Sequence, residues 1–243
     1  MERKLPLKST NRNIRFFKGI SSHYQELIKK RPSLHWMRMI VEPRMGEKVL
    51  DLGNGGLREF FSERTSLYVG VDLSLEMLKK GGDRSIQKIC GEANALSFKK
   101  EVFDTIFHRS LLHHLAEKDM ERTMRRVKTV LHHESTCLKK EGNVIILEPC
   151  LPVFLERIER NFFLILRAFF FLTKQSEIFL FSAKSLTSVL RESGYKEIKM
   201  WRGGIGERSL WEWISPFIGF PFLKIPRWLN PVRRVILEGK EKS

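Results

Sequence analysis

Four residues around position 53 could hold a ligand at a single turn of the chain. The segment Asp51-Leu-Gly-Asn-Gly55 follows an apolar stretch, which predicts a short strand that runs directly into a glycine turn. Gly53 and Gly55 can adopt positive φ and let a ligand approach the backbone. The pattern opens like a dinucleotide-binding fingerprint, but Arg58 stands where that fingerprint has its last glycine. Asp51 would also repel a diphosphate, so the turn favours a cationic ligand without phosphate.

A second acid, Asp72, ends the next predicted strand, one strand–helix–strand unit after Asp51. An acid at this separation reaches ribose hydroxyls in nucleotide-binding α/β folds. The alternative is that Asp72 caps the helix that begins near Ser74. Because the glycine turn and the acid occur together, the sequence favours the ribose role.

Histidines follow the fourth predicted strand at His108, His113 and His114. Imidazole titrates near neutral pH, so His108 and His113, or the adjacent His114, are candidate general bases. Adjacent histidines on a helix point about 100° apart and chelate one ion poorly. No carboxylate cluster accompanies them, so no metal is expected.

Five short apolar runs before residue 150 must position these groups. Their order predicts strands at 48–52, 68–72, 87–90, 103–107 and 143–148, with helices at 34–41, 75–80 and 117–131 between or before them. The tail adds a helix at 184–193 and strands at 195–201 and 234–238. Alternation of this kind predicts an α/β fold, a doubly wound, seven-stranded, mostly parallel sheet with a crevice at the carboxyl ends of its strands.

Two segments stand outside that alternation. Residues 1–44 are predicted to form a basic N-terminal arm with helices, one of them at 21–30, and residues 45–243 to form the main domain. The main domain carries aromatic-rich inserts at about 151–180 and 203–231, where a substrate lid is expected. The first contains a Phe- and Leu-rich helix candidate at 153–172, and the second contains prolines five residues apart, which exclude a regular helix.

The start of the chain, at Phe17, Ile20, Tyr24 and His35-Trp36, is loosely similar to quinone C-methyltransferases. The ordered set of motifs after it resembles that of class I S-adenosylmethionine-dependent methyltransferases. Residues 49–55 look like the first motif of this family and residues 71–78 like its second strand and following helix. Residues 91–98 are similar to the segment that reads adenine, and residues 103–115 to the fourth strand and its loop. A turn at 138–143 and the exit Glu148-Pro149 frame the fifth strand. The resemblance implies a Rossmann-like fold and S-adenosylmethionine as cofactor.

The resemblance also implies roles for single residues. Asp72 would bind the ribose hydroxyls, and the turn would hold the methionine part of the cofactor. The remaining cofactor contacts implied in this way are Asp51, Gly53, Asn54, Gly55, Leu73, Glu92, Ala93, His108 and Tyr24. Leu57 replaces a glycine common in the family, Asn54 a common Cys or Ala, and Glu92 the usual Asp.

The formal net charge of +16 is concentrated at the two ends of the chain. Residues 1–44 hold 11 Lys/Arg against 3 acids, and residues 196–243 hold 10 against 5. Together with the aromatic inserts, these ends predict a small apolar or lipid-like acceptor and attraction to an anionic membrane surface. Solvated surface charge and a second small core are the plainer alternatives. An RNA or rRNA methyltransferase, and a non-catalytic binding module with this fold, are the other functions that the charge and motifs permit.

Three scattered cysteines give no disulfide framework, and no segment looks like a signal peptide or a spanning helix. The sequence therefore predicts a cytoplasmic protein, with association at a membrane surface left open. The oligomeric state is not encoded in any motif.

Overall fold

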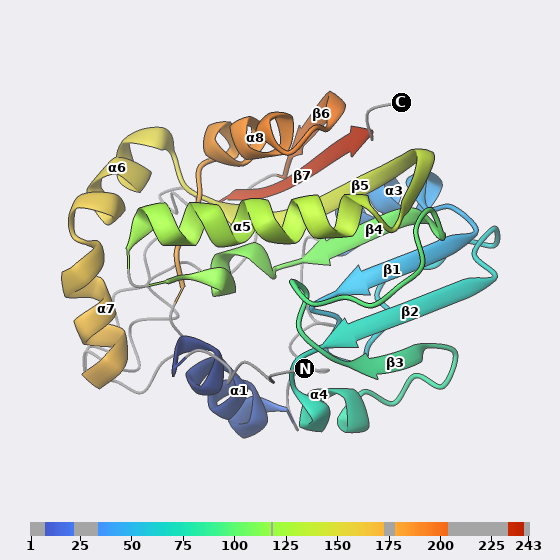
Figure 1. Ribbon diagram of the computed structural model, residues 1–243, viewed down its shortest axis with the longest axis horizontal. Helices are drawn as coiled ribbons and strands as arrows, with labels where there is room; N and C mark the ends of the chain where they lie inside the picture. The colour runs from blue at the N-terminus through green and yellow to red at the C-terminus, as the bar shows by residue number, and fades with distance from the viewer. Residues whose placement is uncertain (1–7, 22–33, 118, 173–177, 204–232, 241–243) are drawn as a thin grey trace.

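The computed structural model describes residues 8–21, 34–117, 119–172, 178–203 and 233–240. Its centre is a seven-stranded sheet with the order β3-β2-β1-β4-β5-β7-β6 (Figure 1). The strands are β1 (Lys48–Leu52), β2 (Leu67–Asp72), β3 (Gln87–Cys90), β4 (Phe103–Arg109), β5 (Leu138–Cys150), β6 (Lys196–Arg202) and β7 (Arg233–Lys240). The predicted seven-stranded sheet is thus confirmed.

Strands β1 to β5 run parallel to one another, whereas β7 is antiparallel to both β5 and β6. The chain moves outward from β1 to β3 and then returns to place β4 on the other side of β1. Such a reversal opens a crevice at the carboxyl ends of the central strands. In Figure 1 the arrowheads of β1, β2 and β3 point toward the side of the molecule where α1 and α7 lie.

Helices cover both faces of the sheet, because its central strands are apolar on both sides. The described helices are α1 (Lys8–Ile20), α3 (Leu34–Val41), α4 (Leu75–Lys80), α5 (Met120–Ser135), α6 (Val153–Asn161), α7 (Phe163–Leu172) and α8 (Ala183–Glu192), with short 3-10 turns η1 (Glu42–Arg44) and η2 (Leu112–Leu115). The helices predicted at 34–41 and 75–80 are confirmed with the same bounds.

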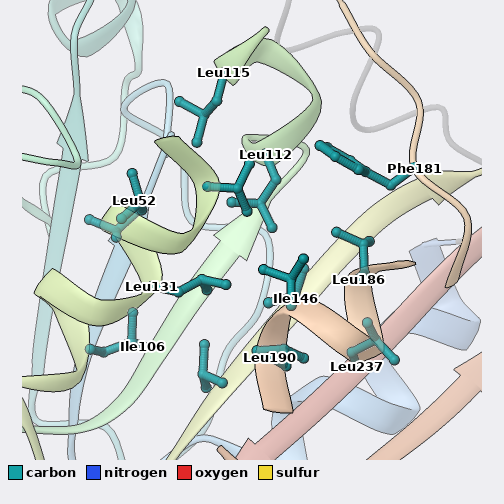
Figure 2. Close-up of a cluster of buried hydrophobic side chains, with 14 of the residues drawn as sticks. Leu52, Ile106, Leu112, Leu115, Leu131, Ile146, Phe181, Leu186, Leu190 and Leu237 are labelled. Carbon is teal, nitrogen blue, oxygen red and sulfur yellow. The ribbon is translucent and has the colours of Figure 1, made fainter. Parts of the chain in front are cut away.

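Each face of the sheet packs against its own cluster of buried side chains. On one face, side chains of α5 and α8 pack against β4, β5 and β7, as Figure 2 shows for Leu131, Leu186, Ile146 and Leu237. On the other face, α3 packs against a second cluster that includes Phe107 of β4. Successive side chains of a strand point to opposite faces, so the two faces of β4 belong to different clusters.

Three sequence predictions differ from the fold. The segment 153–172 forms two helices, because Phe162 leaves helical geometry and Phe163 turns into the core against Phe179. The turn predicted at 138–143 is a bulge inside β5, with Glu141 at a φ of 64° and a register shift against β4. Helix α1 forms within the segment predicted as a basic arm.

Some predictions concern parts of the chain outside the described residues. Tyr24 and the helix predicted at 21–30 lie there, apart from Ser21, as does nearly all of the insert at 203–231. Among the helices that the structure describes, none has the length and apolar character needed to cross a membrane.

Candidate functional site

The glycine turn after β1 has the backbone conformation that its residues predicted. Gly53 and Gly55 adopt φ values of 74° and 62°, a region that other residues rarely enter. Gly56, also at positive φ, lies so close to α4 that a β-carbon on it would come within 2.9 Å of the Leu78 backbone. The turn is therefore fixed between the end of β1 and the start of α4.

Asp51 lies fully buried beneath this turn. Its Oδ2 accepts hydrogen bonds from Asn54 Nδ2 at 2.6 Å and from the Tyr68 hydroxyl at 2.7 Å. Its Oδ1 has no hydrogen-bond donor among the described residues. Burial raises the pKa of Asp51 to about 6, although the nearby Arg109 guanidinium acts in the opposite direction. A buried carboxylate oxygen without a partner fits a ligand that brings its own cation.

Asp72 joins the turn to the end of β2. Its Oδ2 accepts from the Gly55 N–H at 2.9 Å and its Oδ1 from the Ser74 N–H at 2.8 Å. Burial raises the pKa of Asp72. The N-cap of α4 is Ser74, whose hydroxyl accepts from Met77. The alternative that Asp72 itself caps this helix is therefore wrong.

The residues predicted to face adenine lie at the same edge of the sheet. Leu73 follows Asp72, and the Asp72 carbonyl accepts from the Gly91 N–H at 3.0 Å, which brings Glu92 and Ala93 beside the end of β2. All three side chains are half-buried. The structure thus brings the predicted cofactor residues that follow β1, β2 and β3 together at one edge of the sheet.

His108 lies in a different place from the one predicted. Its side chain shares the face of β4 that α5 covers, is fully buried, and forms an ion pair with Glu134. Glu134 also accepts a hydrogen bond from the Tyr195 hydroxyl at 3.2 Å. The alternation of side chains along β4 turns His108 into the core, so the structure does not bring it to the glycine turn.

Arg109, the next residue, faces the opposite way and reaches the turn. It is 2% exposed, donates to the Asn54 carbonyl at 2.5 Å, and pairs with Glu59 at 3.0 Å. The sequence analysis did not single out Arg109 or Glu59. The signal that could have found Arg109 is an arginine at the end of a buried strand, where a charge requires a partner.

His113 occupies η2, directly beyond β4. Its Nδ1 lies 2.6 Å from Glu148 Oε2 near the end of β5, and Glu148 Oε1 accepts from the Leu112 N–H at 2.7 Å. An acid that accepts from Nδ1 leaves Nε2 as the basic nitrogen of a neutral imidazole. Sequence analysis named Glu148 only as part of a motif, because its pairing with His113 depends on the adjacency of β4 and β5.

Helix α1 and the segment before α8 close in on η2. Asn13 of α1 donates to the His114 carbonyl at 3.0 Å, and the Phe17 and His114 rings contact edge to face at 5.0 Å. The Phe179 N–H donates to the His113 carbonyl at 2.9 Å. Burial holds the pKa of His114 well below its usual range. The His113 ring contacts the His114 ring at 4.1 Å, so Phe17 and Phe179 lie beside η2 next to this pair of rings.

The described residues contain no group of three or more His, Cys, Asp or Glu side chains that could hold a metal ion. The chemical groups at the carboxyl edge are thus a partnerless carboxylate oxygen, a second carboxylate at the end of β2, and a histidine–glutamate pair.

Comparison with known proteins places this site in a family context. Residues 50–139 match the family model described as a methyltransferase domain. No match is found among curated protein sequences. The matched segment runs from β1 to the start of β5 and contains every described residue predicted to contact the cofactor.

Three solved structures show the same fold at low identity. A methyltransferase of Thermotoga maritima, described as a possible histamine N-methyltransferase, has a TM-score of 0.58 and 18% identity over 94% of this chain and 99% of its own. The 1,6-didemethyltoxoflavin-N1-methyltransferase of Burkholderia thailandensis, solved with S-adenosylhomocysteine, has a TM-score of 0.60 and 13% identity over 100% of this chain and 94% of its own. Phosphoethanolamine N-methyltransferase 2 of Haemonchus contortus has a TM-score of 0.62 and 12% identity over 98% of this chain and 61% of its own.

The methyltransferase-domain match over residues 50–139 and the seven-stranded fold support a class I S-adenosylmethionine-dependent methyltransferase. Within that class, the chain carries the methyltransferase domain of the matched family over residues 50–139, and two of the neighbours named above were solved with S-adenosylhomocysteine. Its acceptor has to be argued from the site.

Proposed function

We propose that this enzyme transfers a methyl group to a small, apolar or lipid-like acceptor that binds beside the His113–Glu148 pair. The observation that carries the proposal is the placement of this pair. It lies at the same edge of the sheet as the glycine turn, beyond the ends of the next two strands, and the His113 ring contacts the His114 ring, which in turn contacts Phe17. We therefore assign the ends of β1, β2 and β3 to the cofactor, as the cofactor half of the edge, and the region beyond β4 and β5 to the acceptor, as the acceptor half.

On the cofactor half, the partnerless Oδ1 of Asp51 is assigned to the ammonium of the methionine part. Asp72 is assigned to the ribose hydroxyls, for which each of its oxygens keeps an unused lone pair beside one backbone N–H bond. The backbone of Gly53, Asn54 and Gly55 would line the methionine part. Leu73, Glu92 and Ala93 are assigned to adenine, as the sequence predicted.

When bound, S-adenosylmethionine supplies an electrophilic methyl group on its sulfonium. On the acceptor half, His113 would take the proton that a hydroxyl or acidic carbon loses when it is methylated. Glu148 accepts from Nδ1, orients the ring, and stabilises the imidazolium that results. Because Glu148 is also held by the Leu112 N–H, the pair is fixed before the acceptor binds.

An apolar acceptor is supported by the neighbours of His113. Phe17 and Phe179 approach η2 from α1 and from the segment before α8, and Phe181 packs against Phe179 at 5.0 Å. Small acceptors are also bound by the two neighbours solved with S-adenosylhomocysteine, namely 1,6-didemethyltoxoflavin and phosphomonomethylethanolamine. These observations favour a small molecule over RNA.

The outer face of α6 supports delivery of the acceptor from an anionic membrane surface. Its acids turn inward, since Glu156 accepts from Ser185 and Glu159 accepts from the Leu180 N–H. Burial also raises the pKa of Glu159 to about 7, which reduces the negative charge of this helix near neutral pH. Arg157 and Arg160 are exposed.

Large apolar side chains share that exposed surface and continue onto α7. The exposed set on these two helices comprises Val153, Phe154, Ile158, Phe162, Leu164, Ile165 and Leu172. Apolar side chains interleaved with arginines are the composition of helices that lie at anionic lipid headgroups. Figure 1 places α6 and α7 at one end of the molecule, beyond the arrowheads of the strands.

The acceptor class is tested with methyl-labelled S-adenosylmethionine and three acceptor pools: a lipid extract, small phenols and quinols, and total RNA. Label in the lipid or phenol pool that disappears in Asp72→Ala and His113→Gln supports the proposal. Label confined to RNA, and lost in the same variants, would replace it with the RNA alternative.

Membrane docking is tested by sedimentation with vesicles of neutral lipid alone and of neutral lipid with an anionic lipid. Ile158→Ser should reduce pelleting with the anionic vesicles, whereas Met39→Ser, a similarly exposed side chain on α3, should not. Equal pelleting of both variants, or none by the unmodified protein, would remove the membrane from the proposal.

A further inference from the structure

Beneath the glycine turn lies a buried charge network that the roles assigned above do not use. Arg109 and Glu59 form an ion pair at 3.0 Å with side chains that are 1% and 4% exposed. A buried ion pair gains little stability over apolar side chains of similar volume, because both charges lose their hydration. Its position against the cofactor turn therefore suggests a role other than stability.

The contacts of Arg109 connect it to the turn from below. It ends β4, and its guanidinium donates to the carbonyl of Asn54, at 2.5 Å, in the middle of the turn. The Asn54 side chain in turn donates to Asp51 Oδ2 at 2.6 Å and to the Leu57 carbonyl at 2.6 Å. A displacement of Arg109 would thus be transmitted to the backbone that lines the methionine part of the cofactor.

We infer that Arg109 is a positioning residue for the methyl donor: it holds the glycine turn through Asn54 and keeps the buried Asp51 carboxylate charged for the ammonium of the donor. The inference rests on the proposed function, which assigns Asp51 to that ammonium. Asp51, Glu59 and Arg109 together carry one net negative charge. A net negative site matches a donor whose ammonium, sulfonium and carboxylate sum to one positive charge.

The groups around Asp51 act on it with opposite signs. Burial disfavours the carboxylate, Arg109 from β4 favours it most strongly, and hydrogen bonds from Tyr68 of β2 and from Asn54 favour it further. Glu59 opposes it more weakly. Arg58 lies over the Tyr68 ring, 4.9 Å from its centroid. Together these leave the pKa of Asp51 at about 6, so removal of Arg109 would carry it toward neutral pH.

The experiment measures the dissociation constant of S-adenosylhomocysteine by calorimetry from about pH 5 to 7.5, together with the melting temperature. S-adenosylhomocysteine carries the ammonium but no sulfonium, so a change of its affinity near pH 6 reports on the ammonium contact without a contribution from the sulfonium charge. The unmodified protein should bind more tightly as the pH rises through about 6, where Asp51 ionises. In Arg109→Met this rise should move upward by about one pH unit, which weakens binding by nearly tenfold at about pH 5 but only by about twofold near pH 7.

Two further variants separate positioning from a purely structural ion pair. Glu59→Gln should move the pH profile in the opposite direction, because it removes the charge that opposes Asp51. The double variant Glu59→Gln/Arg109→Met should recover the melting temperature lost in Arg109→Met. It should keep an upward shift of the profile, since the effect of Arg109 on Asp51 exceeds that of Glu59.

A double variant with the affinity and pH profile of the unmodified protein would overturn the inference and reduce Arg109–Glu59 to a structural pair. An unmodified protein that binds S-adenosylhomocysteine without any change near pH 6 would also overturn it, while the assigned cofactor site would stand. Absence of binding by the unmodified protein would instead overturn the cofactor assignment, and the inference with it.

Discussion

The two halves of the carboxyl edge are built in different ways. The cofactor half is assembled from the ends of β1, β2 and β3 and from one glycine turn, all within about 45 residues of sequence. The acceptor half combines α1, η2, the end of β5 and the segment before α8. A site built from neighbouring motifs can be recognised in sequence, whereas a site built from distant elements has to be found in the fold.

Two histidine–glutamate pairs in the described part of the chain also differ in their surroundings, although their histidines are only five residues apart, in β4 and in η2 directly after it. His113–Glu148 lies at the edge among groups that can meet an acceptor, and His108–Glu134 lies inside the core beneath α5. Similar side chains should therefore affect activity in one place and stability in the other.

The largest expected effect is at His113. His113→Gln should lower the methyl-transfer rate by about 10²–10⁴-fold, because glutamine cannot take a proton from the acceptor. Its affinity for S-adenosylhomocysteine should stay near that of the unmodified protein. The measurements are initial rates with labelled donor and calorimetry. Equal loss of rate and affinity would place His113 on the cofactor half instead.

The matched change in the core is His108→Leu. It leaves Glu134 buried without its ion-pair partner, which typically costs about 3–5 kcal/mol of unfolding free energy. Urea unfolding measures the loss, and His108→Leu/Glu134→Leu should regain much of it. A fall in the methyl-transfer rate of the folded protein as large as that of His113→Gln would break the contrast between the two pairs.

On the cofactor half, Asp72→Ala should weaken S-adenosylhomocysteine binding by about 2–3 kcal/mol, because the ribose hydroxyls lose a charged acceptor. Loss of the Gly55 and Ser74 contacts adds to the effect. Asp83→Ala, a change to an exposed acid that bonds only to Ser85, is the control. An unchanged dissociation constant in Asp72→Ala would show that the ribose binds elsewhere.

Asp51→Asn should raise the stability of the protein while it weakens cofactor binding. The folded-state pKa of Asp51 is raised from 3.8 to about 6, so its charge opposes folding above pH 6 and not below pH 3.8. The free energy of unfolding of the variant should therefore be roughly 1–2 kcal/mol higher near pH 7.5. This is less than the pKa shift of Asp51 alone implies, because the attraction between Asp51 and Arg109 is lost. The gain should vanish near pH 4, and cofactor affinity should fall. Destabilisation at both pH values would contradict the assigned pKa direction.

Much of the fold follows from local pattern. Short apolar runs, bounded by charged or glycine residues, place β1 and β3 at their observed bounds, and the neighbouring strands within two residues, apart from β5. The extension of β5 through residues 138–143 was missed because a bulge with Glu141 at positive φ has the same local signature as a turn. The break between α6 and α7 was missed because it serves the packing of Phe163 in the core.

The sequence by itself determined the seven strands, the glycine turn and the acids that end β1 and β2, because each depends on residues close together in the chain. Tertiary structure alone decided which face each residue of β4 meets. It turned His108 into the core and Arg109 beneath the cofactor turn, and it paired His113 with Glu148. Strand order and the alternation of side chains settle such contacts, and neither is written in any single motif.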